Sequence, residues 1–237
     1  MAASRFAIVC ATLSLASFGV GRSGGAEPGV VVDFLKVSQT RASLDTVVGT
    51  IYHRDDGVTF IHSRVPIAQW VWVSSQHITV YYPDKKRALR MPSVNPLTLP
   101  FFQTFVSISG AETGLGELGY RITGSGAVGD SLVTDWVAKT PLSASLLRAQ
   151  TVHHDDQLIS VAFYGKNDEL LLEIWCTNYE KKGSREFPMI IEINRYGEDP
   201  TFERVEFSGL VFDGVLIDSV KTLRIPSDVT VENLGRE

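Results

Sequence analysis

The chain has 237 residues, of which 44% are hydrophobic and 21% are charged. These proportions are ordinary for a globular protein, and the length suits one domain with a sizeable core. The net charge is −5 and the sequence pI is near 5.6, so no basic surface is available to hold nucleic acid or an anionic membrane by charge.

Residues 1–26 have the composition of a secretory signal peptide. A basic start, MAASR, is followed by the apolar run FAIVCATLSLASFGV and by small residues that permit cleavage after Ala26. A membrane anchor is the alternative, but the run is shorter than the roughly 20 residues that span a bilayer. We therefore expect residues 27–237 to form one mature, soluble domain outside the cytoplasm. Cleavage leaves Cys176 as the only cysteine, so no internal disulfide can form, and its apolar neighbours predict a buried thiol.

The first part of the mature chain predicts a meander of short strands. Turn signals recur about every ten residues, which is typical of all-β folds. Asp56-Gly57 favours a tight hairpin turn, and residues 83–86 (PDKK) favour another. The predicted strands span 32–41, 46–53, 58–64, 68–74, 76–82 and 87–91.

The pattern changes between residues 92 and 110. Apolar residues recur at helical spacing behind two prolines, which predicts a short helix that either covers a sheet or packs as a plain core helix. Its apolar face would carry Phe101, Phe102, Phe105, Val106 and Ile108. Residues 110–130 are rich in glycine and predict a loop. Further strands are predicted over 130–139, 146–153, 158–164, 170–178, 187–195, 202–208 and 220–225.

Some of these strands are apolar on both faces. In residues 68–74 one face carries Trp70 and Trp72, and the other carries Val71 and Val73. An antiparallel sheet that faces water usually has one polar face. These strands therefore need cover on both sides, or else they line an apolar cavity. The series could close a barrel, stack as a sandwich or stay open as a curved sheet, and the pattern does not show which face points inward.

Motifs for catalysis or metal binding are weak. Residues 124–129 match G-x-G-x-x-G, but no helix or acidic residue follows at the positions that dinucleotide binding needs, so a flexible hairpin loop is favoured. Residues 153–156 (HHDD) point alternately to opposite sides of an extended chain, which favours a solvated turn over a metal site. No G-x-S-x-G or H-E-x-x-H motif is present. We expect no catalytic residues, no metal and no cofactor.

The residues from Gly49 to Met91 resemble those of a known family. Pro66 and Gln69 in "VPIAQW", followed by "VYYPDKK", are similar to the P-x-x-Q and W-x-Y-D-P stretches of the periplasmic outer-membrane lipoprotein carriers, the LolA-type proteins. The later "EFPMIIEI" and "VKTLRIPSDV" are similar to that family's C-terminal strands. The chain departs from the family at residues 61 and 62, where isoleucine and histidine replace an arginine linked to lid control and a tryptophan, and it lacks the long leading helix.

The resemblance implies an incompletely closed antiparallel β-barrel with a short helical lid over an apolar cavity. Such carriers take up acyl chains of lipoproteins in the periplasm and pass them from an inner-membrane transporter to an outer-membrane receptor. We expect a non-enzymatic lipid or lipoprotein carrier of this kind, acting as a monomer. The alternative is a periplasmic sensor or scaffold of the same fold that binds envelope proteins. The candidate residues for the cavity and lid are Trp70, Val71, Trp72, Val73, Ile78, Val80, Tyr82, Phe101, Phe102 and Phe105.

Overall fold

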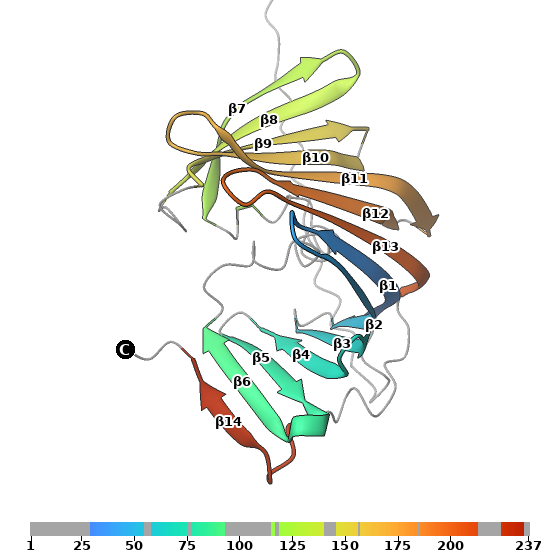
Figure 1. Cartoon of the computed structure of the whole chain (residues 1–237). Coiled ribbons are helices and arrows are strands. Elements are labelled where there is room, and N and C mark those ends of the chain that lie inside the picture. Colours follow the sequence, from blue (N-terminus) through green and yellow to red (C-terminus); the bar gives the residue numbers. More distant parts are fainter. Residues whose placement is uncertain are drawn as a thin grey trace, which may run out of the picture.

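The protein is built on one strongly curved β-sheet (Figure 1). In the computed structural model, fourteen strands form this sheet within the described residues, and the two edge strands, β7 and β14, are not paired with each other. None of the helical turns in this part of the chain has the length and apolarity of a membrane-spanning helix. The described residues are 29–54, 58–74, 77–92, 115–116, 119–139, 146–155, 157–183, 185–212 and 224–234.

The first six strands follow one another as an antiparallel meander. They are β1 (Gly29–Gln39), β2 (Leu44–Arg54), β3 (Thr59–Val65), β4 (Gln69–Val73), β5 (His77–Tyr82) and β6 (Arg87–Pro92). Between β5 and β6 the predicted turn is present as a short 3-10 helix, η1 (Pro83–Lys85), and Lys86 leaves it in the left-handed region with φ 46°. The hairpin turn predicted at Asp56-Gly57 lies outside the described residues.

The next seven strands form a second antiparallel meander. They are β7 (Tyr120–Val128), β8 (Ser131–Ala138), β9 (Arg148–His154), β10 (Gln157–Tyr164), β11 (Leu170–Lys182), β12 (Arg185–Arg195) and β13 (Thr201–Phe212). Strand β13 pairs with β1 and so joins the two meanders into one sheet. The last strand, β14 (Thr230–Asn233), pairs with β6 in the parallel sense at the opposite edge.

The expected fold class, mainly β with an open, curved antiparallel sheet, is confirmed. The helical lid predicted between residues 92 and 110 lies outside the described residues. Two other predictions were wrong. Residues 120–128 form strand β7 rather than a loop, and Arg224 and Ile225 are not in a strand, because the final strand begins at Thr230. Pairing with β8 overrides the weak strand propensity of the glycines in β7, and Gly129, with φ 64°, makes the hairpin turn.

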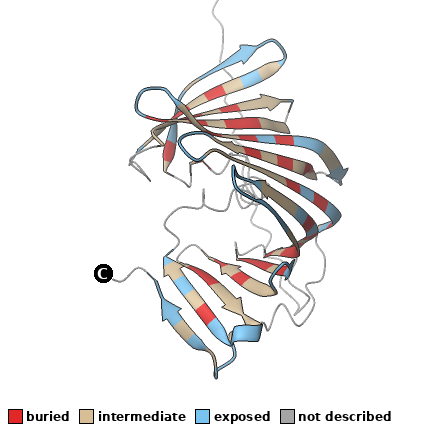
Figure 2. Ribbon diagram, viewed as in Figure 1, coloured by how far each residue is buried: buried red, intermediate tan, exposed pale blue. Residues whose placement is uncertain are grey.

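The core lies on the concave face of the sheet. Neighbouring strands lie about 4.8 Å apart, so β7 and β10, three spacings apart, would lie roughly 14 Å apart in a flat sheet. The Tyr120 ring on β7 and the Phe163 ring on β10 are nevertheless only 6.0 Å apart between centroids. The sheet therefore curves toward the face that carries these rings. The buried residues form one cluster that extends across the strands on this side (Figure 2).

Candidate functional site

Apolar side chains occupy the concave face along most of the sheet, and the buried ones form one cluster. Residues that pair across strands point to the same face, so each row of paired residues can be read directly from the register. One such row contains Ile51, Ile61, Val71 and Val80 of β2 to β5. In the other meander Ile191, Ile193 and Val205 are 0% exposed. The middle of this face is therefore both apolar and screened from water.

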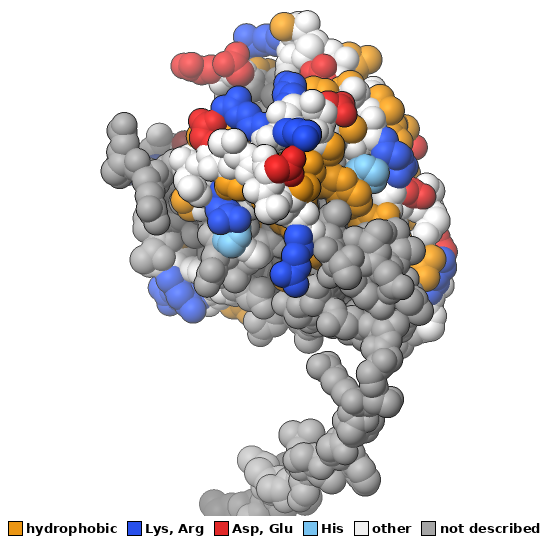
Figure 3. All heavy atoms as spheres, turned by 90° about the horizontal axis from the view of Figure 1, so that it is seen from below, with side chains coloured by type: hydrophobic (Ala, Val, Ile, Leu, Met, Phe, Trp, Pro, Cys, Tyr) orange, Lys and Arg blue, Asp and Glu red, His pale blue; other side chains and the backbone are white. Residues whose placement is uncertain are grey.

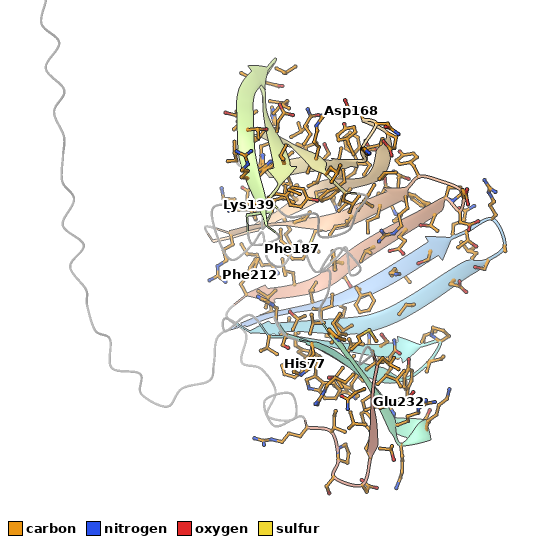
Figure 4. All side chains as sticks on the ribbon, turned by 90° about the vertical axis from the view of Figure 1, so that its left-hand side faces the viewer. His77, Lys139, Asp168, Phe187, Phe212 and Glu232 are labelled. Carbon is orange, nitrogen blue, oxygen red and sulfur yellow. The ribbon has the colours of Figure 1, made fainter. Side chains whose placement is uncertain are left out.

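Aromatic rings occupy the centre of this surface. Phe187 of β12 lies edge-to-face against Phe207 of β13, with 5.1 Å between ring centroids, and 6.5 Å from Phe212. Phe187 and Phe212 lie near the middle of the sheet, seen from its open side in Figure 4. The Arg185 guanidinium lies 5.4 Å from the Phe212 ring centroid, which covers this end of the aromatic group with a cation.

Several polar groups on the concave face are paired with one another, whereas the buried Thr201 Oγ1 has no hydrogen-bond partner within the described residues. The indole Nε1 of Trp136 donates to Thr151 Oγ1 at 3.1 Å, and His53 Nδ1 lies 2.8 Å from Thr59 Oγ1. Lys36 and Glu203 form an ion pair at 3.3 Å. Because these groups satisfy one another, they present no converging nucleophile and base to a substrate. Among the described residues, no three His, Cys, Asp or Glu side chains are grouped to hold a metal ion.

The convex face of β2 to β5 carries a group of aromatic rings. His62 of β3 stacks on Trp70 of β4, with 4.0 Å between centroids and 2° between ring planes. Trp72 lies 6.3 Å from Phe60 and 6.4 Å from Tyr81. All of these rings except that of Phe60 are partly exposed. From below, hydrophobic side chains gather on the surface between charged ones (Figure 3).

Charged groups border this aromatic layer. Thr50 Oγ1 donates to Asp33 Oδ1 at 2.5 Å and accepts from Arg64 Nη1 at 2.6 Å, and Arg64 also pairs with Asp33 at 3.5 Å. Burial, and to a smaller extent the nearby Arg64 guanidinium, lowers the pKa of His62 from its usual 6.5. His62 is therefore a neutral stacking partner for Trp70 at pH 7.

Known structures share this architecture, although no family model and no curated protein matches the chain. A LolA superfamily protein from Nitrosomonas europaea superposes with a TM-score of 0.59 and 12% identity, over 83% of this chain and 91% of the other. A domain from Vibrio parahaemolyticus assigned to outer membrane lipoprotein sorting gives a TM-score of 0.61 and 12% identity, over 82% and 89%. This protein has a LolA-like fold.

A third structure broadens the comparison. A DUF1329 family protein from Desulfovibrio piger superposes with a TM-score of 0.59 and 15% identity, over 81% of this chain and 89% of the other. At these identities the likeness concerns the fold. The resemblance proposed from Pro66, Gln69 and the 83–86 turn thus agrees with the LolA-like fold found here.

The structure separates the predicted site residues by face. Val71, Val73, Ile78 and Val80 lie on the concave face of the LolA-like sheet, and Tyr82 follows on the same side by alternation along β5. The two tryptophans of β4, Trp70 and Trp72, lie on the convex face. The three phenylalanines predicted for the lid, Phe101, Phe102 and Phe105, lie outside the described residues. The structure thus answers which face of β4 points inward, while the binding role of these residues stays a prediction.

Most of the inner surface of the LolA-like sheet was not among the predicted residues. Strands β8 to β13 supply many of the buried residues of this face, including Trp136, Phe163, Phe187, Ile191, Ile193 and Phe207. A signal was available in β12, where Phe187, Met189, Ile191 and Ile193 alternate with other residues, as expected for one buried face.

Cys176 lies within the same core. The residue is 3% exposed, and burial raises the pKa of its thiol to about 12. Since the thiolate is the reactive form, Cys176 acts as a small apolar side chain, as its apolar neighbours predicted.

Proposed function

We propose that the protein is a periplasmic, non-enzymatic carrier that binds acyl chains of lipoproteins or lipids on the concave face and moves them toward the outer membrane. The proposal includes export by a signal peptide at residues 1–26. It also includes two protein partners, an inner-membrane transporter that loads the carrier and an outer-membrane receptor that unloads it. Export can be checked by N-terminal sequencing of the protein from a periplasmic fraction, which we expect to begin at Glu27.

The observation that carries this proposal is the apolar character of the concave face, whose buried side chains form one cluster across the strands. Transfer of each acyl methylene from water to such a surface contributes about 0.8 kcal/mol. An acyl chain can therefore be held without charged or catalytic groups. Polar groups on this face such as Trp136 and Thr151 are hydrogen-bonded to each other, which lowers the cost of their burial.

The four tryptophans offer a direct test, because they lie on different faces. Trp136 is on the concave face, whereas Trp70, Trp72 and Trp175 are on the convex face. Two variants would each keep one tryptophan, either Trp136 or Trp175, with the others changed to Phe. Each is then titrated with a peptide that carries a brominated acyl chain, since bromine quenches indole fluorescence on contact. We expect strong quenching of Trp136 and little quenching of Trp175.

The matched control is the same peptide without its acyl chain, which should quench neither variant. Equal quenching of both tryptophans would indicate non-specific adsorption of lipid and would contradict a site on the concave face. Saturable quenching of Trp175 alone would place the lipid on the convex face.

The second candidate is the sensor or scaffold that binds envelope proteins. The partly exposed aromatic layer around Trp70 and Trp72 favours it, because exposed aromatic rings bordered by charges are common at protein interfaces. The two candidate functions differ in which face of the sheet should be sensitive to substitution. If the protein is a scaffold, it should bind no acyl chain, and Trp72→Ala should abolish binding of its protein partner. If it is a carrier, the Trp72→Ala variant should still bind acyl chains.

A further inference from the structure

The two edges of the sheet differ in how they are protected against pairing with another strand. Strand β14 is four residues long and lies beside charged groups, with ion pairs joining Arg87 to Glu232 and Lys86 to Asp228. Short length and charge are the usual means by which an edge strand avoids pairing with another chain. The edge formed by β14 is therefore protected.

Strand β7, at the upper end of the sheet in Figure 1, has none of this protection. It is nine residues long, and from Ile122 to Val128 it contains neither charge nor proline. All but one of these seven residues are exposed, and no neighbour beyond β7 is found among the described strands. One bulge interrupts its pairing with β8, between Ile122 and Gly124, so the stretch from Gly124 to Val128 is regular. This stretch offers free backbone donors and acceptors to an incoming strand.

We infer that β7 pairs antiparallel with β7 of a second copy of this chain, about a two-fold axis at Gly126. In this register Gly126 faces Gly126, Ser125 faces Ala127, and Gly124 faces Val128. The facing residues lie on the same side of the sheet, since Gly124, Gly126 and Val128 alternate with Ser125 and Ala127. If one copy were shifted by one residue, facing residues would lie on opposite sides of the sheet. Antiparallel pairing does not allow this arrangement, so the shifted register is excluded.

The side chains of β7 are self-complementary in this register. Val128 is 67% exposed, and it would lie beside Gly124 of the other copy. At Gly124 an added Cβ would meet only Asp135 Oδ2, at 3.9 Å, so the space beside it is open. The two-fold axis repeats this contact, so each copy covers the exposed valine of the other. Glycines in an edge strand commonly accept a larger side chain from the neighbouring strand.

Charge at the two ends supports a second copy rather than an unrelated strand. Arg121 precedes the uncharged stretch, and Asp130 follows it in the turn, where it is largely exposed. Antiparallel self-pairing brings Arg121 of one copy next to Asp130 of the other, twice in each dimer. A parallel arrangement would instead place like charges together. This inference replaces the monomer expected from the sequence, goes beyond the carrier proposal and does not depend on lipid binding.

Disulfide trapping tests the inference directly. In the mature chain, which lacks Cys10, Gly126→Cys places a thiol at the proposed two-fold axis, where the two Cα atoms of an antiparallel pair lie about 4.5–5.5 Å apart, within the range for a disulfide. The remaining native thiol, Cys176, is buried and does not compete. After mild oxidation, we expect denaturing electrophoresis without reductant to show a species of twice the mass of the single chain. The control is Thr230→Cys, which is exposed on the protected edge and should form no disulfide-linked dimer.

Sedimentation equilibrium of the unmodified chain provides the second measurement. We expect an average mass that rises with concentration toward that of a dimer, and we expect Val128→Lys to abolish this rise by placing a charge at the edge. The control Leu132→Lys places the same charge on β8, one strand inside the edge, and should leave association unchanged. Equal trapping of the two cysteine variants, or a mass that does not change with concentration, would overturn the inference.

Discussion

The two faces of strand β4 both carry hydrophobic side chains, but these differ in how far they are buried. Val71 and Val73 lie on the concave face within the core, while Trp70 and Trp72, next to them in the chain, form part of a partly exposed aromatic layer. The larger residues of this strand are thus the more accessible ones. Curvature explains the difference, because side chains on the inside of a bend converge and exclude water, whereas those on the outside diverge.

The comparison also separates two kinds of proposed binding. The concave face suits a flexible apolar chain, which gains free energy from burial wherever it lies on the surface. The convex layer around Trp70 suits a protein surface, because its partly exposed aromatic rings, bordered by Asp33 and Arg64, offer both area and charge. The following changes, ordered from the largest expected effect to the smallest, test whether the two faces differ in this way.

The largest effect is expected from truncation at the centre of the concave face. Phe187→Ala removes a buried ring that packs against Phe207 and Phe212, and should lower the free energy of unfolding by about 3–5 kcal/mol. Urea denaturation followed by far-UV circular dichroism measures this loss. The convex control, Trp175→Ala, removes a ring that is 38% exposed and should cost about 1 kcal/mol or less. Equal losses would show that the two faces are buried alike.

A smaller loss of stability is expected at Gly49, where the concave face is closely packed. A Cβ at this position would overlap the backbone carbonyl oxygen of His62 and lie 2.7 Å from the Phe34 ring. Gly49→Ala should therefore lower the free energy of unfolding by about 1–3 kcal/mol. The control Gly126→Ala meets no atom within 4 Å and should change stability by about 0.5 kcal/mol at most. Thermal unfolding of both variants separates the two cases.

Acyl binding should depend on the concave face alone. Val80 and Tyr81 are neighbours on β5 that point to opposite sides of the sheet, and both are only partly buried. Val80→Glu places a carboxylate against the proposed acyl chain and should weaken uptake of an acylated peptide by at least about tenfold, or ~1.4 kcal/mol. Tyr81→Glu is the matched control and should leave uptake unchanged. Similar losses in both variants, measured by fluorescence titration, would remove the distinction between the faces.

The smallest effect is expected from the titration of His62 on the convex face. Because burial and Arg64 lower the pKa of His62 in the folded state, the unfolded chain binds this proton more readily as the pH falls through 6.5. His62 should therefore reduce stability on acidification and contribute no such dependence above neutral pH. In a variant that keeps Trp70 as its one tryptophan, fluorescence should report the protonation of the stacked imidazole with a midpoint below 6.5.

His62→Gln is the control for this titration and should remove the fluorescence change. A midpoint at or above 6.5 in the variant that retains His62 would show that stacking on Trp70 stabilises the imidazolium more than burial and Arg64 oppose it.

Much of the strand order could be predicted because its signals are local. Turn residues such as Pro83 and Asp84 interrupt the apolar runs at regular intervals, and they lie where the structure has the η1 turn. Strand β7 was missed because Gly124 and Gly126 have weak strand propensity and extend only through pairing with β8. Strand β14 was missed because its partner, β6, is distant in sequence and pairs with it in the parallel sense, which no local turn signals.

The sequence by itself determined that β4 has two apolar faces, because alternation along an extended strand follows from covalent geometry alone. It also determined that charges gather in turns and that no recognisable catalytic motif is present. Only the tertiary structure decided that Val71 and Val73 point into the core and that Trp70 and Trp72 point out. The direction in which a sheet curves depends on the packing of side chains from many strands, as between Tyr120 and Phe163, and no single strand contains that information.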